Sequence, residues 1–73
     1  MPIVFSRHAK EQLRKRRISQ RLALETVRKP SKMIASFKNR KLRQVVKGGK
    51  ILEVITMTEG SKITIITGYY LKK

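Results

Sequence analysis

The stretch KLRQVVKGGKILEVITMT, residues 41–58, decides the fold of this 73-residue chain. With the period of two that is typical of β-strands, Lys41, Arg43 and Lys47 share one face of the first half, and residues 51–58 are rich in the β-branched side chains that strands favour. Two adjacent glycines permit the positive φ angles of a tight hairpin turn. The stretch therefore predicts a strand over residues 41–47 that turns at Gly48-Gly49 into a second strand over residues 51–58.

The residues before Pro30 have a different period. Residues 2–5 form a short apolar run and predict a first strand. Ser6 is a candidate N-cap for a helix through about Arg16, and Ser19 is a candidate N-cap for a second helix that Pro30 stops. Both helices are short and amphipathic, so they need a sheet to pack against.

Two further strands complete the expected domain. Residues 33–37 form one of them, with Met33, Ala35 and Phe37 on one face, and are followed by a turn at Lys38-Asn39-Arg40. Residues 63–71 form the last strand after a turn at Glu59-Gly60-Ser61. The order is β-α-α-β-β-β-β. We expect one α+β domain over residues 1–73, with the two N-terminal helices packed on one face of an antiparallel sheet.

Charge indicates the class of partner. The chain holds nineteen lysines and arginines against four acids, a net charge of +15, and no acid lies between Glu25 and Glu53. Such an excess favours polyanionic partners, of which nucleic acid is the first candidate. The absence of cysteine and the single histidine argue against a bound metal or cofactor. No membrane span or signal peptide is recognisable, so we expect a cytoplasmic protein.

The strand over residues 41–47 is the candidate binding strand. If Leu42 and Val46 pack under the helices, then Lys41, Arg43 and Lys47 project from the open face of the sheet. The alternative is a strand that charge merely protects from aggregation. Because no acids accompany these cations, we favour contact with a ligand.

Three other side chains carry possible chemistry. Tyr69 and Tyr70 point to opposite faces of the last strand, so at most one shares a face with the basic residues, where a tyrosine can stack on a base or transfer a proton. His8 can serve as a base or make a structural hydrogen bond. The run from Arg14 to Arg17 is mostly solvated helix surface, although Arg16 or Arg17 can reach the sheet.

Several short motifs resemble a known family. They are Phe5-Ser6-Arg7-His8-Ala9, Arg17-Ile18-Ser19 between the helices, Arg28-Lys29-Pro30, the basic strand with its Gly48-Gly49 turn, and the closing run from Ile65 to Tyr69. Together they resemble small uncharacterised domains of the RelE/ParE toxin superfamily, the broad group to which BrnT-type toxins belong. The resemblance covers nearly the whole chain, which is shorter than RelE and lacks a clear C-terminal helix.

The resemblance implies a RelE-like fold and a metal-independent endoribonuclease, an mRNA interferase of a type II toxin–antitoxin system. In such enzymes the 2′-hydroxyl of RNA attacks the adjacent phosphate. By position, Lys41 and Arg43 match the family's basic strand residues and Tyr69 or Tyr70 its tyrosine, with His8 as a further proton-transfer candidate. The cations expected to contact RNA are Lys38, Arg40, Lys47, Lys50 and Arg17.

The resemblance also implies partners and leaves alternatives. The expected partners are messenger RNA, in some members bound to the ribosome, and an acidic antitoxin protein. One alternative is a non-catalytic module that binds RNA, DNA or the ribosome. Another is a ParE-like toxin that acts on a protein target, because one fold can carry several functions.

Overall fold

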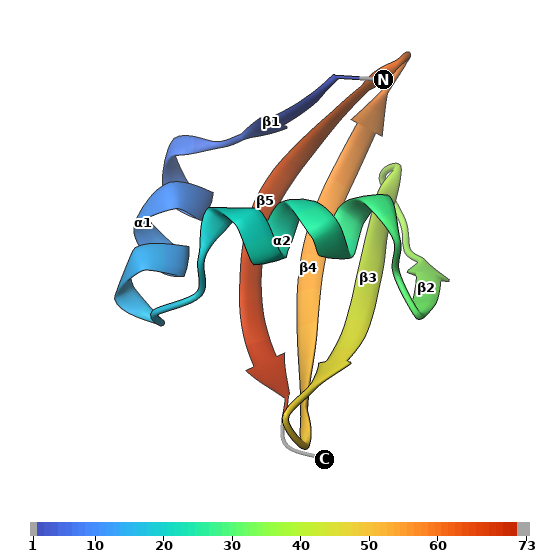
Figure 1. Ribbon diagram of the computed structural model, residues 1–73. Coiled ribbons are helices and arrows are strands. Elements are labelled where there is room, and N and C mark those ends of the chain that lie inside the picture. Colours follow the sequence, from blue (N-terminus) through green and yellow to red (C-terminus); the bar gives the residue numbers. More distant parts are fainter. Residues whose placement is uncertain (1, 72–73) are drawn as a thin grey trace.

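The computed structural model describes residues 2–71 and contains two helices and five strands (Figure 1). In chain order these are β1 (Ile3–Phe5), α1 (Arg7–Lys15), α2 (Gln20–Arg28), β2 (Lys32–Ala35), β3 (Arg40–Lys47), β4 (Lys50–Glu59) and β5 (Lys62–Leu71). The expected α+β order is confirmed. Neither described helix is long and apolar enough to cross a membrane.

The five strands form one mixed sheet in the order β1-β5-β4-β3-β2. The pairs from β2 to β5 are antiparallel, whereas β1 runs parallel to β5, with Ile3 opposite Ile63 and Phe5 opposite Ile65. The expectation of a purely antiparallel sheet is therefore wrong at this edge. The helix pair carries the chain from β1 to the far edge at β2, and three hairpins then return it beside β1, which leaves the first and last strands parallel.

Both helices begin at the serines that the sequence indicates. The Ser6 hydroxyl accepts a hydrogen bond from the Ala9 amide at 3.0 Å, and the Ser19 hydroxyl accepts one from the Leu22 amide at 3.0 Å. These bonds satisfy amide donors that the first turn of a helix leaves free. Each cap fixes where its helix starts and so how that helix meets the sheet.

The end of α1 has the pattern of a Schellman motif. Arg17 has a φ of 58°, its amide donates to the Arg14 carbonyl, and the Ile18 amide donates to the Leu13 carbonyl at 2.8 Å. Ile18 and Leu13 are both buried, as the hydrophobic contact of this motif requires. Glycine usually occupies the left-handed position, which here holds an arginine.

The core lies between the helix pair and one face of the sheet. Ala9 and Leu13 of α1 pack with Ala23 and Val27 of α2 against the central strands. In Figure 1, α2 crosses in front of β5, β4 and β3, while α1 lies beside β5. The helices cover only this face, which we call the helix face, and leave the opposite open face of the sheet without a second layer.

Gly68 allows α1 to approach β5 closely. A Cβ atom at this position would lie 2.9 Å from Cδ2 of Leu13 and 3.6 Å from the main-chain oxygen of Glu53. The glycine is therefore required by packing, because any larger residue would push against a fully buried leucine.

Candidate nucleic-acid interface

Arg43 does not project from the open face, contrary to the sequence-based expectation. Its side chain is only 9% exposed and lies under α2. Nη1 donates to the main-chain oxygen of Val27 at 3.0 Å, and Nε donates to the Thr56 hydroxyl at 3.1 Å. Burial lowers the pKa of Arg43.

The strand register explains why the predicted faces of β3 are reversed. Arg43 pairs with Val54 and Val45 pairs with Leu52, and both β4 partners are fully buried in the core. Alternate residues share a face, so Lys41 and Lys47 also belong to the helix face. Leu42 and Val46 lie on the open face, where Val46 is 54% exposed.

The buried arginine meets a need of the helix. The last carbonyls of a helix have no partner within it and must find a donor elsewhere. Arg43 supplies that donor to Val27 from the neighbouring sheet. Arg43 therefore positions α2, and its guanidinium, already bonded within the core, is not presented to a phosphate.

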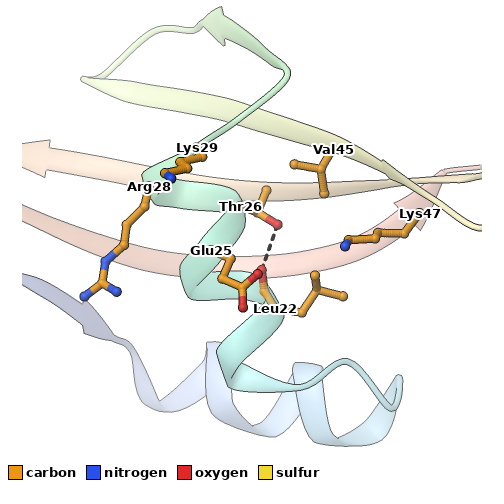
Figure 2. A pocket seen from close by; sticks show the side chains of 7 residues that line it. All are labelled: Leu22, Glu25, Thr26, Arg28, Lys29, Val45 and Lys47. Carbon is orange, nitrogen blue, oxygen red and sulfur yellow. Dashed lines mark hydrogen bonds between the residues drawn. The ribbon is translucent and has the colours of Figure 1, made fainter.

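A basic groove lies between α2 and β3 (Figure 2). Its volume is about 370 Å³. Leu22, Thr26 and Val45 give it an apolar base, and the Thr26 hydroxyl is occupied by a 2.8 Å hydrogen bond that it donates to the Leu22 carbonyl. The charged lining residues are Glu25, Arg28, Lys29 and Lys47.

Lys47 is the predicted RNA-binding residue that the fold brings to this groove. In Figure 2 its side chain points across the groove toward α2, whereas Arg28 points away on the other side of the helix. Glu25 is within reach of Arg21, with 3.5 Å between Nε and Oε1, which offsets its charge. The groove therefore presents a net positive rim to an incoming ligand.

The β3–β4 hairpin brings Lys47 together with two more predicted residues. Lys47 pairs with Lys50 across the Gly48-Gly49 turn, where both glycines have positive φ as predicted. The Lys50 ammonium lies 5.5 Å from the ring centroid of Tyr70, a cation–π distance. Tyr70 is 37% exposed, so this end of the sheet offers two ammonium groups and an accessible aromatic ring.

Tyr69 lies on the open face, and the expectation that the two tyrosines point to opposite faces is confirmed. Its hydroxyl donates a short hydrogen bond to Oε2 of Glu53, and Nε2 of Gln44 donates to Oε1 of the same carboxylate at 2.7 Å. Glu53 is only 5% exposed. Burial, the hydrogen bond to Glu53 and the charge of Glu53 raise the pKa of Tyr69 to about 12, against a smaller opposing effect of Arg16.

Arg16 fastens α1 to the edge of β5 beside this tyrosine. Nη1 donates to the Gly68 carbonyl at 2.9 Å and lies 3.3 Å from the Thr67 hydroxyl, and the guanidinium carbon is 5.9 Å from the Tyr69 ring centroid. The sequence-based suggestion that Arg16 or Arg17 reaches the sheet is thus confirmed for Arg16. Tyr69 and Arg16 form a structural link, with the tyrosine hydroxyl already engaged.

The remaining predicted residues lie apart. His8 is exposed in the first turn of α1, and Arg17 is exposed after its last turn. Lys38 and Arg40 are exposed at the β2–β3 turn, which lies at the other end of β3 from Lys47. Arg40 and Lys47 are about 23 Å apart along an extended strand. His8, Lys41, Arg43 and the tyrosines are not assembled around one point.

Sequence reasoning missed several residues that shape the surface. Phe37 was expected in a strand, but β2 ends at Ala35 and Phe37 is 72% exposed in the turn. Lys29 lines the groove. Glu53 is buried on the open face, where its partners are Gln44 and Tyr69 and not the basic neighbour across the hairpin that a lone acid in residues 51–58 suggests.

The cations are poorly compensated. Arg21–Glu25 is the single ion pair within 4.0 Å among residues 2–71, and it is exposed. Glu53 is occupied by neutral donors, and Glu11 and Glu59 are exposed. A surface with so few internal partners leaves its charge available to a polyanion.

Comparison with known proteins gives a family. The family model described as domain of unknown function DUF4258 matches residues 5–70. No curated protein and no solved structure matches the chain.

Proposed function

The chain belongs to the DUF4258 family, and we propose that it is an RNA-binding module whose exposed cations contact phosphates. The observation that carries this proposal is the uncompensated positive surface around the groove between α2 and β3 and the adjoining β3–β4 hairpin. Lys29 and Lys47 line the groove, and Lys50, opposite Lys47 in the hairpin, lies beside the accessible ring of Tyr70. Phosphates bind to such cations and unpaired bases stack on such rings, so single-stranded RNA fits both features.

The arrangement of side chains supports binding more than cleavage. Metal-independent cleavage would require several groups placed around one phosphate. They must deprotonate the 2′-hydroxyl, stabilise the pentacoordinate phosphorane and protonate the leaving 5′-oxygen. Arg43 is bonded to α2, and the Tyr69 hydroxyl is bonded to Glu53. Neither is poised for that chemistry in this conformation.

An endoribonuclease of the RelE-like kind is the second candidate. Two helices between the first strand and a run of hairpins are consistent with the resemblance seen in the sequence. Tyr70 is the tyrosine that favours it, because its ring is accessible and lies beside Lys50. In this candidate Tyr70 would transfer protons while Lys47 and Lys50 stabilise the phosphate charge.

An acidic protein partner, such as an antitoxin, belongs to the same proposal. The open face of the sheet carries apolar pairs on both sides of Gln44 and Glu53, and no second layer of residues 2–71 covers it: Leu42 pairs with Ile55, Val46 pairs with Ile51, and all four lie on this face. An apolar face without a second layer is typical of a protein interaction site. The charge of +15 opposes a second copy of the chain and favours an acidic partner.

One experiment separates these functions. The purified chain is mixed with an end-labelled single-stranded RNA of about 12 nucleotides, and binding is followed by fluorescence anisotropy while the RNA is analysed on a denaturing gel. The binding module predicts saturable binding with intact RNA. New RNA ends that disappear in Tyr70→Phe would establish the nuclease instead. Absence of both binding and cleavage would reject RNA as the ligand and leave the protein-partner function.

A further inference from the structure

Phe37 is the most exposed large apolar side chain of the described residues, at 72%. It lies directly before the β2–β3 turn, in a segment whose residues from Ser31 to Arg40 are all exposed. Phe37 is not among the residues that pack in or against the core, so the fold itself does not require an aromatic ring at this position. Lys38, Arg40 and Lys41 follow it in the chain.

The turn that carries Phe37 is held in a defined position. The Arg40 amide donates to the Phe37 carbonyl at 3.2 Å, and the Ser36 amide donates to the Arg40 carbonyl at 2.8 Å. The Asn39 carbonyl accepts a hydrogen bond from the Thr58 amide of β4 at 3.1 Å. The turn is therefore tied to the central sheet, and the exposed ring is carried by a fixed backbone.

The backbone of this turn is unusual for its residues. Lys38 has a φ of 58° and Asn39 a φ of 60°. Consecutive left-handed residues are those of a type I′ turn, for which Asn-Gly is the preferred pair. A lysine at such a position is uncommon, and side chains held in unfavourable backbone regions concentrate at functional sites. The lysine next to the exposed ring thus occupies a backbone conformation that lysine disfavours.

We propose that Phe37 stacks on an unpaired base of RNA while Lys38 and Arg40, in the same turn, contact neighbouring phosphates. This inference rests on the proposed RNA binding and adds a second contact region to it, at the opposite end of β3 from Lys47 and Lys50. Aromatic rings beside cations are the common elements of single-strand recognition, because every base offers a π-face and every linkage a negative charge.

The charges around the ring favour RNA over an apolar protein surface. Glu59, which follows the Thr58 that anchors the turn, is exposed and lies opposite Lys62 in the β4–β5 register. Lys38 and Arg40 have no ion pair among residues 2–71. An apolar protein patch would have to desolvate these two cations without compensating them, whereas a nucleotide supplies a ring and an anion together.

The chain contains no tryptophan, so Phe37→Trp introduces a single tryptophan, whose fluorescence can be excited apart from that of the tyrosines, at the proposed stacking position. Titration with polyuridylate is expected to quench this tryptophan at the same RNA concentration at which anisotropy reports binding. Met33→Trp is the matched control, because Met33 is exposed on the preceding strand away from the turn. We expect that control to bind RNA with much less quenching.

Truncation gives the second measurement. Phe37→Ala is expected to weaken RNA binding about 5- to 100-fold, and Phe37→Tyr to restore it, because stacking needs a ring and not a hydroxyl. Phe37→Leu, which stays apolar, is expected to behave like the alanine variant. Normal affinity in Phe37→Ala together with an unquenched Phe37→Trp would overturn the stacking inference while leaving RNA binding intact. If the wild-type chain binds no RNA, the proposed function itself fails.

Discussion

The guanidinium of Arg43 lies 3.0 Å from the main-chain oxygen of Val27, so a strand residue closes the last turn of α2. The same side chain donates to Thr56, whose hydroxyl in turn donates to the Lys41 carbonyl at 3.2 Å. From its charge alone, Arg43 would be expected to bind a ligand, but in the structure it holds α2 on the sheet. The basic groove depends on it indirectly, because it holds the helix that forms one wall.

Replacing Arg43 is expected to reduce stability and not to remove a phosphate contact. Arg43→Ala leaves the Val27 carbonyl without its buried donor and should lower the free energy of unfolding by about 2–4 kcal/mol. Arg43→Lys should lower the free energy of unfolding by less, because the lysine ammonium can still donate one hydrogen bond. Urea denaturation measures both, with Arg21→Ala as the exposed control, which should change stability by less than about 0.5 kcal/mol. A stable Arg43→Ala variant that has lost RNA binding would contradict this role.

The Tyr69–Glu53 hydrogen bond predicts a dependence of stability on alkaline pH. An unfolded tyrosine has a pKa of about 10, whereas the pKa of Tyr69 in the fold is raised to about 12. Its contribution is therefore fully present below pH 10 and is lost as the pH rises from about 10 to about 12. Tyr69→Phe should be less stable at pH 8 by about 1–2 kcal/mol, and its difference from wild type should vanish near pH 12.

Denaturant titrations at several pH values make this comparison, with Tyr70→Phe as the control. Lysines also lose their protons in this range, but they do so in wild type and variant alike, so the difference isolates Tyr69. A constant difference between wild type and Tyr69→Phe from pH 8 to pH 12 would show that the hydroxyl does not contribute in this way.

Gly68 should not tolerate even alanine. The added methyl would lie 2.9 Å from Cδ2 of the buried Leu13, so Gly68→Ala should lower the free energy of unfolding by about 1–3 kcal/mol. Leu13→Val shortens the opposing side chain and should relieve part of this loss. In a double-mutant cycle the two losses should therefore sum to more than the loss of the double variant. If the two losses of unfolding free energy were strictly additive, Leu13 of α1 and residue 68 of β5 would not be in steric contact.

The backbone at Arg17 predicts a gain of stability. Its φ of 58° suits glycine, so Arg17→Gly should raise the free energy of unfolding by about 0.5–1 kcal/mol. We expect the affinity for RNA to stay nearly unchanged, because Arg17 lies apart from the groove and the β3–β4 hairpin. Thermal unfolding and anisotropy measure the two effects, and Arg17→Asn, which also tolerates the left-handed region, should behave in the same way. A stabilised variant that binds RNA much more weakly would place Arg17 inside the interface.

Local features of the fold were accessible from the sequence. Ser6 and Ser19 cap the helices, Pro30 follows the second helix, and Gly48-Gly49 forms the turn, because each of these acts through its own neighbours. Strand boundaries agree to within about two residues. The β1–β5 pairing was not foreseen, since it joins residues sixty positions apart and is parallel.

The faces of β3 show why the candidate site was harder to predict than the fold. Alternation separates Leu42 and Val46 from Arg43 and Val45, but it does not say which set faces the helices. Hydrophobicity favours the first set. In the structure the second set, Arg43 and Val45, faces the helices. Val45 packs toward Leu52, and Arg43 donates to the Val27 carbonyl of α2, which only the tertiary fold brings within reach.

The salt dependence of RNA binding tests the central claim most directly. The double variant Lys47→Gln/Lys50→Gln should bind single-stranded RNA more weakly, and the slope of log affinity against log salt concentration should be shallower than wild type by about 1.4, since each lost phosphate contact removes about 0.7. The control Lys10→Gln/Lys15→Gln, which neutralises two exposed cations of α1, should leave the slope nearly unchanged. Equal slopes for wild type and Lys47→Gln/Lys50→Gln would contradict an interface at this end of the sheet.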